Sequence, residues 1–161
     1  MERLSYRPIS LDDLEPYAEF LADPECTRYL LVPEPHSREQ SRSLLERNVE
    51  QHDGTIGMYT LHDGSALIGW AGFQRREITG APEVELGWLV RKEHWGNGYA
   101  SEAARELQQR GPQRLIHLIH PENGASIAVA QTLGAEHERD TEILGGPVSI
   151  YASRNSRTWF G

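Results

Sequence analysis

The stretch from Glu83 to Leu107 constrains the fold most, because a strand, a glycine turn and a helix follow one another directly. Side chains alternate from Glu83 to Val90 with the period of a β-strand. Gly96 and Gly98 then allow the backbone to approach a ligand closely. The helix that follows, with apolar residues up to Leu107, adds four unpaired amides and the positive end of its dipole. The stretch therefore favours a pyrophosphate site, with a plain glycine turn as the alternative, and it matches neither the P-loop nor the three-glycine dinucleotide pattern.

Hydrophobic spacing and turn residues predict the other elements. Strands are expected at residues 4–8, 56–61, 67–73, 83–90, 115–120, 136–142 and 147–153. Helices are expected at 10–21, 26–31, 37–51, 100–110 and 123–133, with Ser10, Ser37 and Asn123 as N-caps. This order predicts an α+β fold, one mixed sheet with helices on its faces. No repeat or linker divides the chain, so we expect a single domain over residues 1–161.

Composition excludes several classes of protein. A net charge of -8 argues against nucleic-acid binding, which depends on clustered Lys and Arg, and would attract a cationic amine. No apolar run approaches the roughly 20 residues that span a bilayer, so no membrane association is expected. Cys26 is the single cysteine and cannot form an internal disulfide, which favours a cytoplasmic location.

The segment Trp95-Gly96-Asn97-Gly98-Tyr99-Ala100 resembles motif A of the GNAT acetyltransferase superfamily. Gly98 and Ala100 match its last two defined positions, whereas Trp95 replaces the usual Gln or Arg, as in the RimJ/RimL-like branch of ribosomal-protein N-terminal acetyltransferases. The resemblance covers nearly the whole chain in the right order. It includes Arg3-Leu4, Leu67-Ile68-Gly69, Glu85-Leu86-Gly87-Trp88 and the motif B segment from His120 to Ala135.

The resemblance implies a single, mostly antiparallel sheet flanked by helices, in which the fourth and fifth strands separate. It implies acetyl-CoA as cosubstrate, with its pantetheine arm between these strands, and no metal. By position, the cofactor-binding residues would be Leu89, Val90, Arg91, Gly96, Asn97, Gly98, Tyr99, Ala100, Ser101, Asn123 and Ser126. Asn123 and Ser126 also have a purely structural interpretation, as the cap and the first turn of a helix.

Attack on a thioester needs a neutral amine, so a base must remove a proton from the ammonium. Glu85 is the candidate, because its side of the strand faces the expected cleft and also carries Glu83; a solvated strand face is the alternative. His117 and His120 are alternative bases, although each could instead be a packed or partly exposed strand residue. Many family members use a motif B tyrosine as general acid. Ala130 stands at that position, which leaves Ser126 or water to protonate the thiolate.

The sequence therefore predicts an N-acetyltransferase that acts on a primary amine, either a protein N-terminus or a small molecule. A non-catalytic acyl-CoA-binding or sensing module is the main alternative, and a scaffold that has lost the cofactor is another. Trp70 and Trp88 are expected in the core, although they could instead line the acceptor side. The last strand pair and the tail residues Trp159 and Phe160 suggest a possible homodimer.

Overall fold

The computed structural model describes residues 2–155 of the chain. One sheet contains its seven strands in the order β1-β2-β3-β4-β5-β7-β6. The strands are β1 (Leu4–Pro8), β2 (Met58–Asp63), β3 (Ala66–Ile78), β4 (Ala81–Val90), β5 (Arg114–Ile119), β6 (Glu136–Ile143) and β7 (Gly146–Arg154). The α-helices are α1 (Leu14–Ala22), α2 (Pro24–Thr27), α3 (Arg38–Gln51), α4 (Tyr99–Arg110) and α5 (Gly124–Thr132). All strand pairs are antiparallel except β4 with β5.

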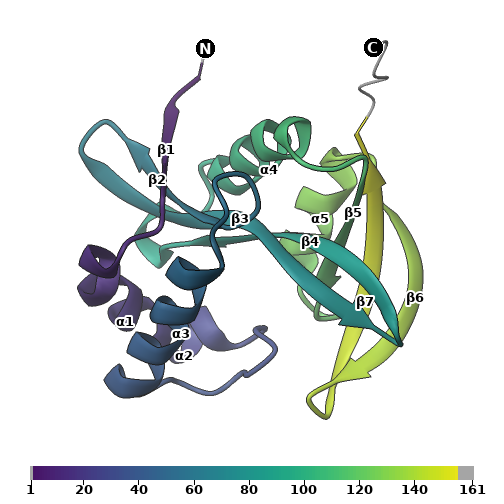
Figure 1. Cartoon of the computed structure of the whole chain (residues 1–161), viewed down its shortest axis with the longest axis horizontal. Helices are drawn as coiled ribbons and strands as arrows, with labels where there is room; N and C mark the ends of the chain where they lie inside the picture. The colour runs from purple at the N-terminus through teal and green to yellow at the C-terminus, as the bar shows by residue number, and fades with distance from the viewer. Residues whose placement is uncertain (1, 156–161) are drawn as a thin grey trace.

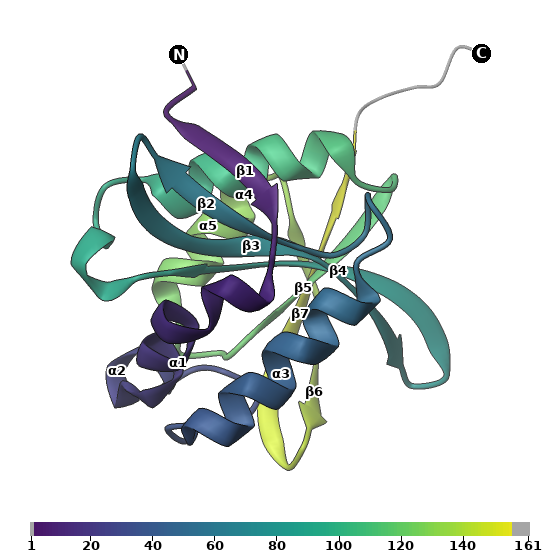
Figure 2. The same ribbon diagram turned by 60° about the vertical axis from the view of Figure 1, so that its left-hand side comes forward.

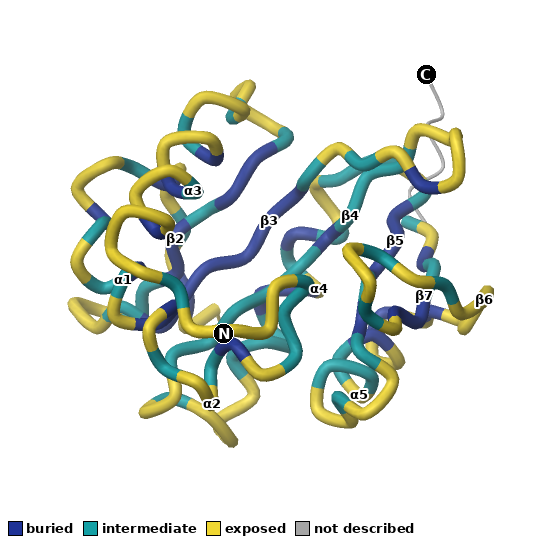
Figure 3. The backbone as a smooth tube through the Cα atoms, turned by 90° about the horizontal axis from the view of Figure 1, so that it is seen from below, coloured by how far each residue is buried: buried dark blue, intermediate teal, exposed yellow. Residues whose placement is uncertain are grey.

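Helices cover both faces of the sheet, with α1, α2 and α3 on one side and α4 on the other (Figure 2). The β1–β3 half lies to the left in Figure 1 and the β5–β7 half, with α5, to the right. Under α4 the core contains Leu86, Leu107 and Leu115, all fully buried. Under α1 and α3 it contains Trp70, whose ring meets Tyr17 edge to face at 5.2 Å. The core position predicted for Trp70 is confirmed, and Figure 3 shows β3 buried along its middle.

The predicted helix caps are present. Ser10 and Ser37 each form a reciprocal capping box, with Asp13 and Gln40 respectively. These bonds satisfy amides that would otherwise be unpaired. The Ser37 box fixes where α3 begins, whereas the Ser10 box starts a 3-10 turn (Leu11–Asp13) that leads into α1, so the helix expected from residue 10 is α-helical only from Leu14. Gly134 follows α5 in the left-handed conformation (φ 72°), as a helix C-terminus requires.

Several predicted boundaries were wrong. β3 continues past the expected end at residue 73 to Ile78, and β4 begins at Ala81 rather than Glu83. The extra residues form a long hairpin whose polar side chains pair across the strands, so they need no apolar alternation. The short helix α2 begins at Pro24 and ends at Thr27, earlier than the expected 26–31.

The seam between β4 and β5 determines where the site lies. These parallel strands pair at Glu85 and Ile116, the one backbone register pair between them in the described part of the chain. Beyond it, residues 87–90 of β4 are all partly exposed, although β4 is the middle strand of the sheet. A middle strand with neighbours on both edges is normally covered, so this end of β4 lies beside a gap.

No helix among residues 2–155 is long and apolar enough to span a bilayer. Trp159 and Phe160, suggested as dimer contacts, lie outside the described residues.

Candidate active site

The β4 side of the gap exposes the backbone of alternate residues. The Arg91 amide donates to Ile68 O of the β3 side at 2.8 Å. Leu89 O also faces β3, because a methyl group added to Gly69 would collide with it. Backbone groups of successive strand residues point to opposite neighbours, so those of Val90 face the gap. Leu89, Val90 and Arg91 were expected to contact a pantetheine arm. Of these three, Val90 is therefore the one whose carbonyl points toward the gap.

Trp95 closes part of this edge. Its indole Nε1 donates to Val90 O at 2.8 Å, and the residue remains 49% exposed. A ligand that pairs with Val90 O must therefore share or displace this bond.

The glycine segment after β4, residues 96–101, has the backbone conformation expected of an anion site and is called the cradle below. Gly96 and Gly98 have φ of 79° and 78°, a left-handed conformation that glycine adopts without strain. The Glu102 amide donates to Gly98 O at 3.1 Å, which marks the first turn of α4. Within residues 2–155, the amides of 96–101 donate to no protein acceptor. This end of α4 can therefore bind an anion.

Arg3 was missed as a site residue. Its Nη2 donates to Asn97 O at 3.0 Å, and its Nε pairs with Glu102 at 2.9 Å. The guanidinium also lies 4.3 Å from the centre of the Tyr99 ring. Arg3, which directly precedes β1, thus holds the cradle through Asn97 and Glu102 and adds positive charge beside it. Nothing in the spacing of Arg3 links it to residues almost a hundred positions away.

Asn123 and Ser126 cap α5 and hold each other. Asn123 Oδ1 accepts from the Ser126 amide at 3.2 Å, and Asn123 Nδ2 donates to Ser126 Oγ at 3.1 Å. The capping role of Asn123 is thus confirmed. Because Ser126 Oγ already accepts a bond, its own hydroxyl proton is free to be donated elsewhere.

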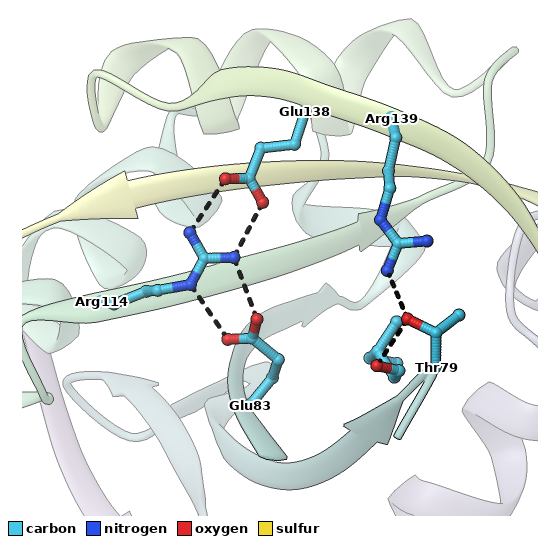
Figure 4. A network of polar contacts seen from close by, with 6 residues as sticks. Thr79, Glu83, Arg114, Glu138 and Arg139 are labelled. Carbon is cyan, nitrogen blue, oxygen red and sulfur yellow. Dashed lines mark hydrogen bonds and ion pairs between the residues drawn. The ribbon is translucent and has the colours of Figure 1, made fainter. Parts of the chain in front are cut away.

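The two β4 glutamates do not form the isolated carboxylate pair that their spacing suggested. Glu83 is held by Arg114 of β5 at 3.0 Å, and Arg114 also binds Glu138 of β6 at 2.8 Å (Figure 4). Glu85 pairs with Arg76 of β3 at 2.8 Å. Each carboxylate therefore has its own guanidinium, which balances its charge on this face of the sheet.

Glu85 nevertheless keeps one oxygen free. Arg76 binds Oε1, whereas Oε2 would lie 3.7 Å from a methyl group added to Gly87. Oε2 thus lies over the glycine, toward the end of β4 that borders the gap. The side chain is only 12% exposed, so few waters compete for this oxygen.

The other candidates are placed less favourably for catalysis. His117 is 1% exposed, and burial lowers its pKa to about 4, so it is neutral at pH 7. Both of its nitrogens are bonded, Nδ1 to Leu86 O and Nε2 to Ser153 Oγ. His120 lies 5.1 Å from the Tyr29 ring, and its Nδ1 accepts from the Glu122 amide. Ala130 is fully buried.

A cavity of about 480 Å³ opens on the same face as Glu85. Its lining includes Leu31, Ile78, Leu118 and Ile143, together with Arg76, which holds Glu85. The cavity thus combines four apolar residues with a larger number of charged and polar ones, and it adjoins the ion pair of the candidate base.

Comparison with known proteins agrees with this geometry. Residues 3–136 match the family model of the acetyltransferase (GNAT) domain. The uncharacterized N-acetyltransferase p20 of Bacillus licheniformis is 28% identical over 156 residues, which cover 90% of this chain and 87% of that protein.

Two solved structures share the fold. Spermidine N-acetyltransferase from Vibrio cholerae, in complex with CoA and spermine, has a TM-score of 0.77 at 16% identity and 96% coverage of both chains. The Salmonella typhimurium acetyltransferase that modifies the N-terminal serine of ribosomal protein L7/L12 has a TM-score of 0.76 at 21% identity, again with 96% coverage of both. The expected α+β fold with its mostly antiparallel sheet is confirmed, and the chain belongs to the GNAT family of acetyltransferases.

Proposed function

We propose that this acetyltransferase transfers the acetyl group of acetyl-CoA to a primary amine by direct attack in a ternary complex. The observation that carries the proposal is the edge of β4 at Val90, where the carbonyl accepts from the exposed Trp95 side chain rather than from β5. This edge leads directly into the unpaired amides of residues 96–101. An extended arm with amide groups fits the first, and a pyrophosphate fits the second. The site would be cytoplasmic and lie within one domain over residues 1–161.

The residues at the gap supply the proton transfers. Glu85 Oε2 accepts a proton from the ammonium, directly or through water, and the neutral amine then attacks the thioester carbonyl. The tetrahedral intermediate collapses as the carbon–sulfur bond breaks. The attached nitrogen loses its second proton in the same step. Ser126 passes its hydroxyl proton to the departing thiolate and receives the proton from the nitrogen, directly or through water, so that the hydroxyl is restored; a thiol of pKa about 8.5 also leaves without full protonation.

The acceptor would enter through the cavity beside Arg76. The four apolar residues of its mixed lining suit the carbon chain of an amine, or the first side chain of a peptide, and the net charge of -8 attracts a cation. Trp95 in place of Gln or Arg supports the RimJ/RimL-like branch, whose acceptors are protein N-termini. The Vibrio cholerae relative instead supports a polyamine-like acceptor, so both acceptor classes belong in the first screen.

Thermal unfolding with and without millimolar acetyl-CoA is the first test, with free CoA and ATP as controls. A ligand that binds only the folded state stabilises it by about 2.7 kcal/mol at a hundredfold excess over Kd. We expect a clear rise in Tm with both CoA forms and little change with ATP. No rise with any of the three would contradict the proposed cosubstrate site.

A non-catalytic acyl-CoA-binding module is the second candidate, favoured by Ala130 at the position of the usual tyrosine. The two functions separate in one assay. Release of free CoA that requires an added amine supports the enzyme, whereas binding of acetyl-CoA without transfer to any peptide or polyamine supports the module.

A further inference from the structure

The buried side chain of His117 forms hydrogen bonds across the boundary between β4 and β5. Its Nδ1 lies 2.9 Å from Leu86 O, and its Nε2 lies 2.8 Å from Ser153 Oγ. A carbonyl only accepts, so Nδ1 carries the proton and Nε2 accepts from the serine hydroxyl. All three residues are at most 1% exposed. A buried polar chain thus joins β4, β5 and β7 through one imidazole.

This contact lies where the backbone ladder stops. Glu85 and Ile116 are paired, and Leu86 is the next residue of β4 toward the gap. If the parallel ladder continued, the next β5 amide to face β4 would be two residues beyond Ile116, at Leu118. The imidazole of His117 instead bonds Leu86 O, the carbonyl that this amide would use, and no second register pair follows between the two strands within residues 2–155.

A side-chain contact also holds β4 and β5 together on the other side of the Glu85–Ile116 pair, away from the gap. Arg114 binds Glu83 through two nitrogens, at 3.0 and 3.1 Å. The register pair is therefore bracketed by Arg114–Glu83 at the closed end and His117–Leu86 at the open end. Two side-chain contacts thus flank the single backbone pair at the point where the strands separate.

We propose that His117 is a positioning residue that stops the β4–β5 ladder at Leu86 and so keeps the β4 edge free for the cosubstrate arm. The inference rests on the proposed function for its ligand. The separation of the strands themselves can be measured without any ligand.

Two substitutions each keep one hydrogen bond of the imidazole and remove the other. In His117→Asn the side-chain amide takes the place of Nδ1 and can still donate to Leu86 O. In His117→Gln the amide reaches the place of Nε2 and Ser153, and Leu86 O loses its partner. Both variants lose a buried ring, so a merely structural role predicts similar losses of stability and similar losses of affinity.

Amide hydrogen exchange and acetyl-CoA affinity provide the two measurements, made on the full chain. In His117→Gln we expect the Leu118 amide to gain at least tenfold protection, as the ladder extends, and acetyl-CoA to bind at least tenfold more weakly. In His117→Asn both quantities should stay within about threefold of wild type.

Unchanged Leu118 exchange in His117→Gln would overturn the inference, as would equal losses of affinity in the two variants. If wild type itself binds no acetyl-CoA, the proposed function fails. The exchange comparison still decides whether His117 sets the point of separation.

Discussion

At the scale of single residues, Glu85 is the most informative side chain. One carboxylate oxygen is bound by Arg76, and the other lies over Gly87 at the gap. The arginine thus fixes the orientation of the carboxylate and leaves one acceptor for the amine. A carboxylate without this partner could rotate among several positions, so we expect the ion pair to orient the base.

Substitution Glu85→Gln removes the proposed base and keeps the shape of the side chain. We expect turnover at pH 7 to fall by about 10²- to 10⁴-fold, the usual contribution of a positioned base, and the Kd of acetyl-CoA to stay unchanged. Glu83→Gln is the matched control, because it weakens the ion pair with Arg114 at the closed end of the β4–β5 contact and leaves Glu85 with its own arginine. Equal turnover in the two variants would remove Glu85 from the mechanism.

Gly87→Ala tests the space beside the free oxygen. The added methyl would lie 3.7 Å from Glu85 Oε2, an ordinary contact, so we expect the variant to fold normally. It should raise KM for the amine more than tenfold and leave acetyl-CoA affinity unchanged. An unaltered KM would place the amine on another path.

The sequence predicted the identity of these residues better than their partners. Alternation placed Glu83 and Glu85 on one face, as observed. It could not show that Arg76 and Arg114 neutralise them, since those arginines come from other strands. His117 was interpreted only as a strand residue or a base, because its bonds depend on the depth of burial and on Ser153.

At the scale of elements, the start of α4 carries the anion site. Gly98 is its N-cap and lies in the left-handed region, with Arg3 as the nearest neighbour of an added side chain. We expect Gly98→Trp to abolish acetyl-CoA binding in calorimetry by filling the cradle. Its backbone strain should cost about 1–2 kcal/mol of stability.

Gly134 provides the control for that strain. It lies at the end of α5 with φ 72°, and an added side chain there would meet no atom within 4 Å. Gly134→Trp should lose similar stability and bind acetyl-CoA normally. Loss of binding in both variants would indicate strain rather than a blocked cradle.

Elements with local signals were predicted most accurately. The capping serines and the left-handed Gly134 specify helix ends through neighbouring residues, so α1, α3 and α5 were recognised from the sequence. The length of β3 was underestimated because its polar end is stabilised by cross-strand ion pairs such as Arg76–Glu85. The single β4–β5 register pair has no local signal, since it joins residues separated by α4.

At the scale of the whole molecule, the buried His117 makes stability depend on pH. Its pKa falls from the ordinary 6.5 to about 4 in the folded state, because burial disfavours the charged ring. The unfolded chain therefore binds this proton first as the pH falls. We expect the contribution of His117 to be complete above pH 6.5, to be lost progressively down to about pH 4, and to change no further below it.

The expected loss is about 3 kcal/mol, the free-energy equivalent of this pKa difference. Urea unfolding of wild type and His117→Asn between pH 4 and 7 isolates it, because asparagine does not titrate. The difference between the two proteins should shrink as the pH falls. A difference independent of pH would mean that the ring titrates normally.

The sparse backbone connection between β4 and β5 has a mechanical consequence. Within each half of the sheet, antiparallel ladders of several register pairs resist deformation, whereas the backbones of β4 and β5 share one register pair in the described residues. We therefore expect any rotation of one half against the other to be centred near residues 85 and 116, where few backbone hydrogen bonds would break. Structures with different ligands should differ mainly in this one angle, so the molecule would close on its cosubstrate as a hinge closes.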